Sequence, residues 1–256
     1  MSGINANGDA IGTNAVGRHS VVFALFNGAF ASIATPFAVA ALDSVVPTGL
    51  NDRRQVTGYY GTGSYGSGGA GDVKSFISSG SSYTVVDVPG TVSTDALAIN
   101  NLGQVVGTYT TVSGVFGQFT YGQLQGFLYD VGGITTIDVP GAMSTVLNGI
   151  NDAGEVSGTY SDTAGVRHGF TEAGEVFSDV TGPDGTAFLG SNVNNQGQLI
   201  GTFGGSGLSY LATPLAVTAV PEPASLALLA SLAAFGAAVR RRGGLKDLPI
   251  SRGGCL

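Results

Sequence analysis

The chain has 256 residues, 43 of them glycine, with 11% charged residues and a formal net charge of −7. Five of its ten basic residues lie after Val239, so the preceding body is strongly acidic and repels phosphate backbones, which excludes nucleic-acid binding. So many glycines suit tight turns between short strands better than helices, where each interior glycine costs about 1 kcal/mol. The composition therefore predicts an all-β fold.

A block of twelve residues occurs five times along the chain. The copies are GINANGDAIGTN (3–14), GLNDRRQVTGYY (49–60), AINNLGQVVGTY (98–109), GINDAGEVSGTY (149–160) and NVNNQGQLIGTF (192–203). Their third residue is always asparagine: Asn5, Asn51, Asn100, Asn151 and Asn194. In four copies a glycine follows three positions later: Gly8, Gly103, Gly154 and Gly197. Asparagine that bonds its own backbone and glycine with positive φ suit a short hairpin loop with a bulge, so we interpret the block as a turn.

A second repeated block follows the asparagine block in four of the units. SFISSGSSYTVVDVPG (75–90) and GFLYDVGGITTIDVPG (126–141) match closely, and residues 23–36 and 169–182 match loosely. The Pro-Gly pair ends a strand, because proline cannot donate to a strand ladder. Each unit is then expected to hold four short strands in about 48 residues, which is the size of a propeller blade.

These units predict a β-propeller-like repeat domain over residues 1–218, with about five blades and an incomplete last one. The expected unit boundaries are about 3–48, 49–97, 98–148, 149–191 and 192–218. One unit cannot bury both faces of its small sheet, so the units must stack. A linear β-solenoid is the alternative arrangement of the same strands.

The apolar stretch 21–41 has two interpretations. Arg18 before it and Ala38-Val39-Ala40 near its end are typical of a cleavable signal peptide. Asn27 and Pro36 interrupt the stretch, and it fits the register of the repeat, so we predict a pair of strands. The printed chain is then expected to begin inside a repeat, downstream of its natural start.

Two insertions lengthen the units, at 61–72 and 110–125. Loops of this length on a propeller emerge on its faces, where function concentrates. Four aromatic residues in them are candidates for stacking on sugar rings: Tyr65, Phe116, Phe119 and Tyr121. A Gly-Ser loop without a ligand is the alternative.

Catalytic signatures are scarce in this sequence. The two histidines, His19 and His168, both precede a Phe-bearing strand, and we predict a structural role for them. Asp87, Asp138 and Asp179 recur at one repeat position and are interpreted as strand-end residues, not as an acid/base pair. We predict no enzyme, no cofactor and no metal site.

Calcium is the one metal that stays an alternative. The acidic turns Asn51-Asp52 and Asn151-Asp152 could offer oxygen ligands, although no D-x-D-x-D loop is present.

The C-terminal segment has a different composition. Residues 224–239 are sixteen uncharged residues, about 24 Å long as a helix, without a polar face. Pro223 suits a helix start, and the arginines that follow can reach a membrane interface. We predict a short transmembrane helix over 224–239.

Two families resemble parts of the chain. Residues 3–203 resemble HAF-type extracellular repeats, although only RHSVVF (18–23) and RHGF (167–170) keep the histidine of that motif. Residues 219–242 resemble the PEP-CTERM sorting signal of Gram-negative bacteria, which has a Pro-Glu-Pro, a short apolar helix and an arginine cluster. Here these parts are Val220, Pro221, Glu222, Pro223, Arg240, Arg241 and Arg242. The tail 243–256 extends past the point where that family usually stops.

The second resemblance implies export, transient anchoring in the inner membrane with the arginines on the cytoplasmic side, and cleavage near Pro-Glu-Pro by an exosortase. We therefore expect an exosortase-processed surface or extracellular-matrix protein with a non-enzymatic structural or interaction role, associated with exopolysaccharide or biofilm. A carbohydrate-binding propeller module is the first alternative, and a propeller hydrolase is the second.

Overall fold

The computed structural model describes residues 2–16, 19–31, 33–36, 45–61, 73–113, 120–182, 187–203 and 209–213. Over these ranges the chain is all-β, as the composition predicted, and no helix occurs in them. The chain divides into two compact parts, Met1–Pro214 and Leu215–Leu256, and every described residue belongs to the first part. The predicted helix 224–239 lies outside the described residues.

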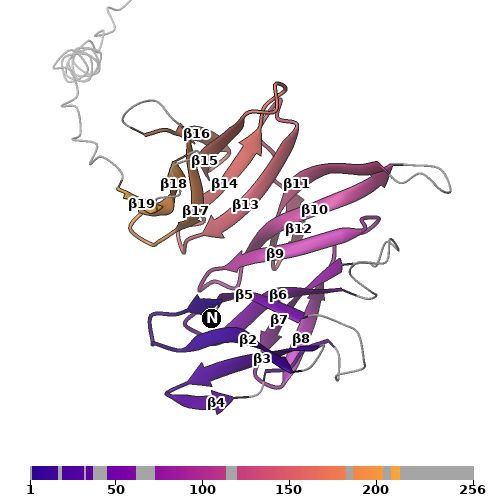
Figure 1. The fold of residues 1–256 in the computed structure, drawn as a ribbon, viewed down its shortest axis with the longest axis vertical. Helices are drawn as coiled ribbons and strands as arrows, with labels where there is room; N and C mark the ends of the chain where they lie inside the picture. The colour runs from indigo at the N-terminus through magenta and orange to yellow at the C-terminus, as the bar shows by residue number, and fades with distance from the viewer. Residues whose placement is uncertain are drawn as a thin grey trace, which may run out of the picture. The chain divides into compact units, whose positions relative to one another are not determined.

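The strands follow one another as antiparallel meanders, which we number unit 1 to unit 5 (Figure 1). Unit 1 contains β1 (Gly3–Ile4), β2 (Ala10–Val16), β3 (His19–Phe26) and β4 (Ala29–Ala31). Unit 2 contains β5 (Val45–Leu50), β6 (Gln55–Gly61), β7 (Val73–Ser79) and β8 (Ser82–Val86). Unit 3 contains β9 (Ser93–Ile99), β10 (Val105–Ser113), β11 (Thr120–Asp130) and β12 (Gly133–Thr136).

The last two units continue this pattern. Unit 4 contains β13 (Ser144–Ile150), β14 (Val156–Ser161), β15 (Arg167–Ala173) and β16 (Val176–Val180). Unit 5 contains β17 (Phe188–Val193), β18 (Leu199–Phe203) and β19 (Ser209–Ala212). A single parallel pairing, of Val73 in β7 with Ser93 in β9, joins units 2 and 3 into one sheet.

Each unit begins with the strand that leads into its asparagine turn, one strand earlier than the boundaries expected from the sequence. The asparagine turn is a hairpin within a sheet, and Leu50 before it pairs directly with Val56 after it. The Pro-Gly turns lie between consecutive units, because proline offers no N–H to continue a ladder.

The strand pair predicted in the apolar stretch 21–41 is present. β3 pairs with β2 from His19 to Leu25 and with β4 at its end, where Phe26 faces Ala29. Ser32 and residues 37–41 of that stretch lie outside the described residues.

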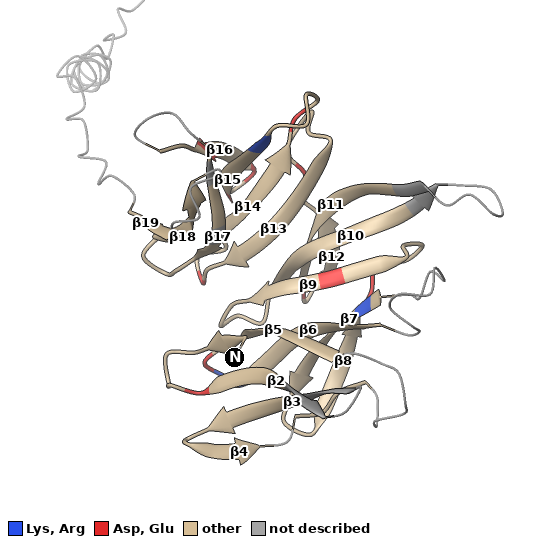
Figure 2. Cartoon of the chain, in the orientation of Figure 1, with Lys and Arg blue, Asp and Glu red and all other residues tan. Residues whose placement is uncertain are grey.

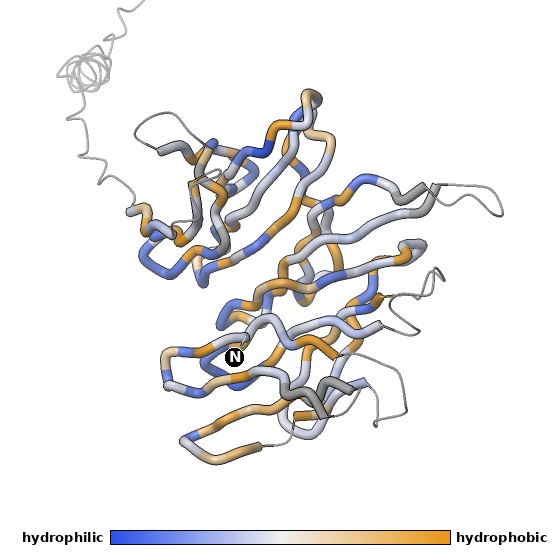
Figure 3. Tube along the Cα trace, viewed as in Figure 1, coloured by the Kyte–Doolittle hydropathy of each residue, from blue (hydrophilic) through white to orange (hydrophobic). Residues whose placement is uncertain are grey.

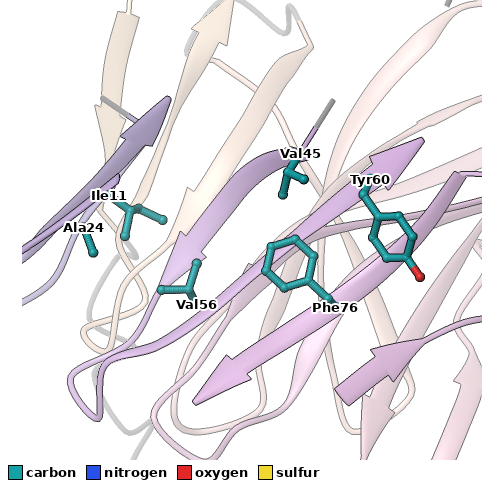
Figure 4. Packing of buried hydrophobic residues seen from close by; sticks show 6 residues of the cluster. All are labelled: Ile11, Ala24, Val45, Val56, Tyr60 and Phe76. Carbon is teal, nitrogen blue, oxygen red and sulfur yellow. The ribbon is translucent and has the colours of Figure 1, made fainter. Parts of the chain in front are cut away.

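The hydrophobic core lies between consecutive units. Figure 4 shows one cluster in which Ile11 and Ala24 of unit 1 meet four residues of unit 2: Val45, Val56, Tyr60 and Phe76. All the more extensive contacts between described strands of different units join consecutive units. The repeat therefore stacks in chain order, because a single small sheet cannot bury both of its faces.

Charge contributes little to this packing. Figure 2 shows few charged residues on the described strands, and Figure 3 shows apolar stretches recurring from unit to unit. Hydrophobic burial between the sheets is therefore the main favourable term, as in other stacked repeat proteins.

Candidate functional site

The five repeat asparagines bond to one another across the units, in what we call the asparagine ladder. The side-chain Nδ2 of each of the first four asparagines donates to the backbone carbonyl of the equivalent asparagine in the next unit. The four steps are Asn5 to Asn51 (3.0 Å), Asn51 to Asn100 (2.9 Å), Asn100 to Asn151 (3.0 Å) and Asn151 to Asn194 (3.1 Å). The recurring residue of the sequence is thus the residue that joins one unit to the next.

The same side chain closes its own turn. Oδ1 of Asn100 accepts the backbone N–H groups of Leu102 and Gln104, both at 3.0 Å, and its Nδ2 donates to Gln104 Oε1 at 2.7 Å. The equivalent three bonds occur in the other four turns. The turn role predicted for these asparagines is present, and the bond between units adds to it.

The residue after each asparagine forms a second ladder. Its backbone N–H donates to the side-chain oxygen of the equivalent residue in the next unit. The steps run from Ala6 to Asp52, from Asp52 to Asn101, from Asn101 to Asp152 and from Asp152 to Asn195, at 2.7 to 2.8 Å. Asn101 Nδ2 also donates to a carboxylate oxygen of both Asp52 and Asp152. The Asn101 amide therefore provides a hydrogen-bond donor to each of the two carboxylates.

This arrangement sets the protonation of Asp152. Burial opposes ionisation, but the backbone and side-chain N–H groups of Asn101 and the side chain of Asn195 outweigh it and lower the pKa of Asp152. The oxygens considered as calcium ligands in the Asn51-Asp52 and Asn151-Asp152 turns thus accept N–H donors of the protein. In the described ranges, no group of three His, Cys, Asp or Glu residues is placed to hold a metal ion.

The turn glycines have the backbone conformation that the sequence predicted. Gly8, Gly103, Gly154 and Gly197 have φ between +69° and +84°. Unit 2 departs from the pattern, since Arg54 occupies this position with φ +60°, which is rare for a residue with a side chain.

Arg54 is held by contacts with unit 1. Its Nε donates to Asp9 Oδ2 at 2.8 Å, its Nη2 donates to Asn27 Oδ1 at 2.8 Å, and its guanidinium carbon lies 5.0 Å from the centre of the Phe26 ring. The Asp9 side chain has no exposed surface, and the Arg54 hydrogen bond lowers the pKa of this carboxyl group. This ion pair ties unit 2 to unit 1, and sequence reasoning missed it because the two residues are far apart in the chain.

A second set of repeat glycines was also missed. Gly58, Gly107, Gly158 and Gly201 lie seven residues after the asparagines, where the preceding strand has an irregular register. A Cβ atom at Gly107 would collide with the backbone carbonyl oxygen of Asp95, and the other three glycines face the equivalent carbonyl. Their recurrence in the sequence was the signal, and it reflects close approach of two backbones.

The recurring aspartates lie in three different units and bond within their own unit. Asp87 pairs with Lys74 Nζ at 2.6 Å, Asp138 Oδ1 accepts the Gly126 N–H at 2.9 Å, and Asp179 accepts the Tyr160 hydroxyl at 3.0 Å. The structure therefore does not bring these carboxylates together.

His168 belongs to a small polar cluster in unit 4. Its Nε2 lies 2.9 Å from Asp162 Oδ2, and its ring stacks on Tyr160 with centroids 4.8 Å apart. The His168 hydrogen bond, followed by the N–H groups of Val166 and Ala164, lowers the pKa of Asp162. Burial, followed by the Asp179 hydrogen bond, raises the pKa of Tyr160. The cluster links β14, β15 and β16 by side-chain contacts.

A shallow hollow of about 290 Å³ lies beside the asparagine turn of unit 3. It is lined by Leu102, Gly103, Gln104, Tyr129, Asp130 and Val131. These residues come from the asparagine turn and from the β11–β12 turn.

Several predicted site residues cannot be placed. Tyr65, Phe116 and Phe119 lie outside the described residues, as do the side chains of His19 and Tyr121. The sorting-motif residues Val220, Pro221, Glu222, Pro223, Arg240, Arg241 and Arg242 also lie outside them.

Comparison with known proteins assigns the C-terminal segment. Residues 219–242 match the family model of the PEP-CTERM protein-sorting motif. No curated protein and no solved structure matches the chain. In the part of the chain that the structure describes, no helix is long and apolar enough to cross a membrane.

The chain is therefore an exported protein that carries a bacterial sorting signal behind an all-β repeat body. The chain carries the PEP-CTERM protein-sorting motif, and this motif implies processing by an exosortase.

Proposed function

We propose that the processed protein is a non-enzymatic component of the cell surface or the extracellular matrix, associated with exopolysaccharide. The observation that carries the proposal is the PEP-CTERM motif at residues 219–242. In this proposal the segment 224–239 anchors the precursor in the inner membrane, with Arg240 to Arg242 on the cytoplasmic side, until the exosortase cuts near Pro221.

The ladders support a structural role for the repeat body. Asn recurs at the turn of all five units, and Asp or Asn follows it in units 2 to 5. These polar residues use their side chains to bond neighbouring units. We infer that the units are the blades of a propeller-like stack related to the HAF-type repeats that the sequence resembles. Such a body presents its loops on a stiff support, which suits a spacer or a scaffold.

Intact mass of the protein from its native host tests this proposal. The membrane, surface and medium fractions are compared between the natural chain and a Pro221→Ala/Glu222→Ala/Pro223→Ala variant. We expect the natural protein at the surface or in the medium without the mass from about Pro221 onward, and the variant unprocessed in the membrane. An uncleaved natural chain that stays in the membrane or in the cytoplasm would refute the proposal.

Carbohydrate binding is the second candidate function, and the hollow beside the unit 3 turn favours it. Its lining includes one aromatic residue, Tyr129, and two polar residues, Asp130 and Gln104, which are residue types that sugar-binding sites use. Binding of the host's own exopolysaccharide is measured for the natural chain, for Tyr129→Ala and for the control Tyr83→Ala in unit 2. Equal binding by both variants would exclude the hollow.

A hydrolase is the weakest alternative. The two carboxylates that would have to act, Asp138 and Asp179, lie in different units and bond to groups of their own sheets. Glycan turnover that is abolished by Asp138→Asn or Asp179→Asn would favour the hydrolase over the structural role.

A further inference from the structure

Each unit has two faces with different partners. We call the face that packs on the following unit the front and the face that packs on the preceding unit the rear. Between units 3 and 4, the front residues Val106 and Leu128 pack in one cluster with the rear residues Ile150 and Phe177. This cluster is the template for a contact between units.

The front of unit 5 has the residues for such a contact and, within the described ranges, no following unit. Ile200 occupies the repeat position of Val106, and its cross-strand partner Leu211 occupies that of Leu128. Ile200 is 51% exposed and Leu211 is 65% exposed. The residues equivalent to Ile200 in the other four units have no exposed surface: Ile11, Thr57, Val106 and Ser157.

The rear of unit 1 is uncovered in the same way. Ile4 occupies the position of Ile150, and Phe30 occupies that of Phe177 and contacts Phe23 edge to face. Ile4 is 66% exposed and Phe30 is 81% exposed, whereas Ile150 is 5% exposed. Two apolar patches thus lie at opposite ends of the stack. The patch on unit 5 has the residues of a front face, and the patch on unit 1 has the residues of a rear face.

The asparagine ladder stops at the same two faces with complementary groups. Asn194 Nδ2 donates to Gln198 Oε1, and among the described residues it has no carbonyl of a following unit to bond. The Asn5 carbonyl accepts the N–H of Gly8, and among the described residues no preceding amide reaches it. One end therefore offers the donor, and the other end offers the acceptor, of one more ladder step.

We propose that the front of unit 5 docks on the rear of unit 1 of a second copy of the chain. Ile200 and Leu211 of one copy would then lie against Ile4 and Phe30 of the next, and Asn194 would bond the Asn5 carbonyl. The occupant is a second copy because the rear of unit 1 carries the apolar residues and the ladder acceptor that match the front of unit 5. Among the described strands of one chain, the more extensive contacts between units join only consecutive units. This contact is heterologous, so it repeats from copy to copy and builds a head-to-tail assembly.

One hydrogen bond of the second ladder would be missing from this contact. Ala6 occupies the position where Asp52, Asn101, Asp152 and Asn195 supply a side-chain oxygen, and alanine has none. The backbone N–H of Asn195 therefore finds no acceptor on unit 1 of the next copy. An Ala6→Asn substitution would supply that acceptor and should strengthen docking.

Cross-linking between two differently tagged chains tests the proposal. Both chains are full length, are purified in a mild nonionic detergent, and carry Cys255→Ser. One also carries Ile4→Cys and the other Ile200→Cys, and a short bis-maleimide is added to the mixture. We expect a mixed dimer, and no dimer from either chain alone, because identical ends do not face each other in a head-to-tail contact.

A matched control uses Val131→Cys in place of Ile4→Cys, since Val131 is fully exposed at the β11–β12 turn of unit 3. A yield of mixed dimer no higher than in this control would overturn the proposal. So would a chain with both Ile4→Cys and Ile200→Cys that gives only an internally cross-linked monomer, which would mean that one chain closes on itself. An Ile200→Cys chain that resists maleimide would show that another part of the chain covers this face, and this result would overturn the proposal as well.

Two further substitutions measure the contact itself. Leu211→Asp in the Ile200→Cys chain buries a carboxylate against Phe30 of the partner, and we expect the yield of mixed dimer to fall about tenfold. Ala6→Asn in the Ile4→Cys chain adds one hydrogen bond, and we expect a rise of about threefold to tenfold. Unchanged yields in both variants would contradict the docking geometry.

Discussion

Replacing Asn100 with alanine removes one complete step of the asparagine ladder. Asn100 is 4% exposed, and its side chain makes four hydrogen bonds. Three of them stay within the turn, and the fourth reaches the Asn151 carbonyl in unit 4. Asn100→Ala thus tests whether the turn and the contact between units depend on one side chain.

The size of the effect follows from the groups left without a partner. A buried donor or acceptor that loses its hydrogen bond costs about 1 to 3 kcal/mol. The Leu102 N–H lies in an exposed turn where water can replace the lost bond, and the Asn151 carbonyl keeps the N–H of Gly154. The main losses are therefore the Gln104 N–H and the bond between units, so we expect a decrease of about 3 kcal/mol in unfolding free energy.

Asn194→Ala is the matched control. Asn194 makes the same three turn bonds, but its side chain is exposed and it bonds no following unit in the described structure. We expect Asn194→Ala to cost about 1 kcal/mol.

Both variants are unfolded in urea as full-length chains in a mild nonionic detergent, followed by far-ultraviolet circular dichroism. Because a stack of repeats can unfold unit by unit, hydrogen exchange measured by mass spectrometry then locates the loss. Asn100→Ala should raise exchange in units 3 and 4 together. Equal losses for the two variants, or a change confined to the unit 3 turn, would refute the role of Asn100 between units.

Three further predictions concern single residues and use the same unfolding assay. Gly107→Ala should cost about 3 kcal/mol because its Cβ meets the Asp95 carbonyl, and a loss no larger than that of Gly154→Ala, which meets no atom and bears only the strain of its positive φ, would contradict this. Arg54→Ala should be less stable than Arg54→Gly by about 1 kcal/mol, because both lose the Asp9 ion pair but only glycine relieves the positive φ, and a reversed order would count against the strain. Burial raises the pKa of Asp95, so the charged form of this carboxyl group disfavours folding. Asp95→Asn should therefore stabilise the protein at pH 7, and the gain in stability should vanish below about pH 4, where the carboxyl group is protonated in both the folded and the unfolded state. A gain that does not depend on pH would contradict this role of the Asp95 charge.

The sequence predicted the local structure well because turns and strands leave a local signal. Asparagine with a glycine three residues later specified the hairpin, and the glycine content specified the fold class. The period of the repeat also indicated stacking. These are properties of a few neighbouring residues, and the structure shows them at Asn100 and Gly103 in the predicted form.

The contacts between units were not predictable in the same way. A period shows that Asn51 and Asn100 have equivalent places, but it does not say that one bonds the other. The pairing of Arg54 with Asp9 spans 45 residues, and Arg54 departs from the glycine of the motif, so the sequence indicated only an irregular turn there. The role of Gly107 depends on the register of the preceding strand, which the sequence does not specify. The aromatic residues of the insertions stay predictions.

The nearest-neighbour pattern of the ladders has a mechanical consequence for an exported protein. Each step bonds only two units, so a pulling force applied to the chain ends can detach a terminal unit while the others keep all their bonds. A released unit of about 45 residues lengthens the chain by about 150 Å when fully extended. Under shear the body would therefore yield in separate increments, absorb work at each one, and recover unit by unit when the load is removed.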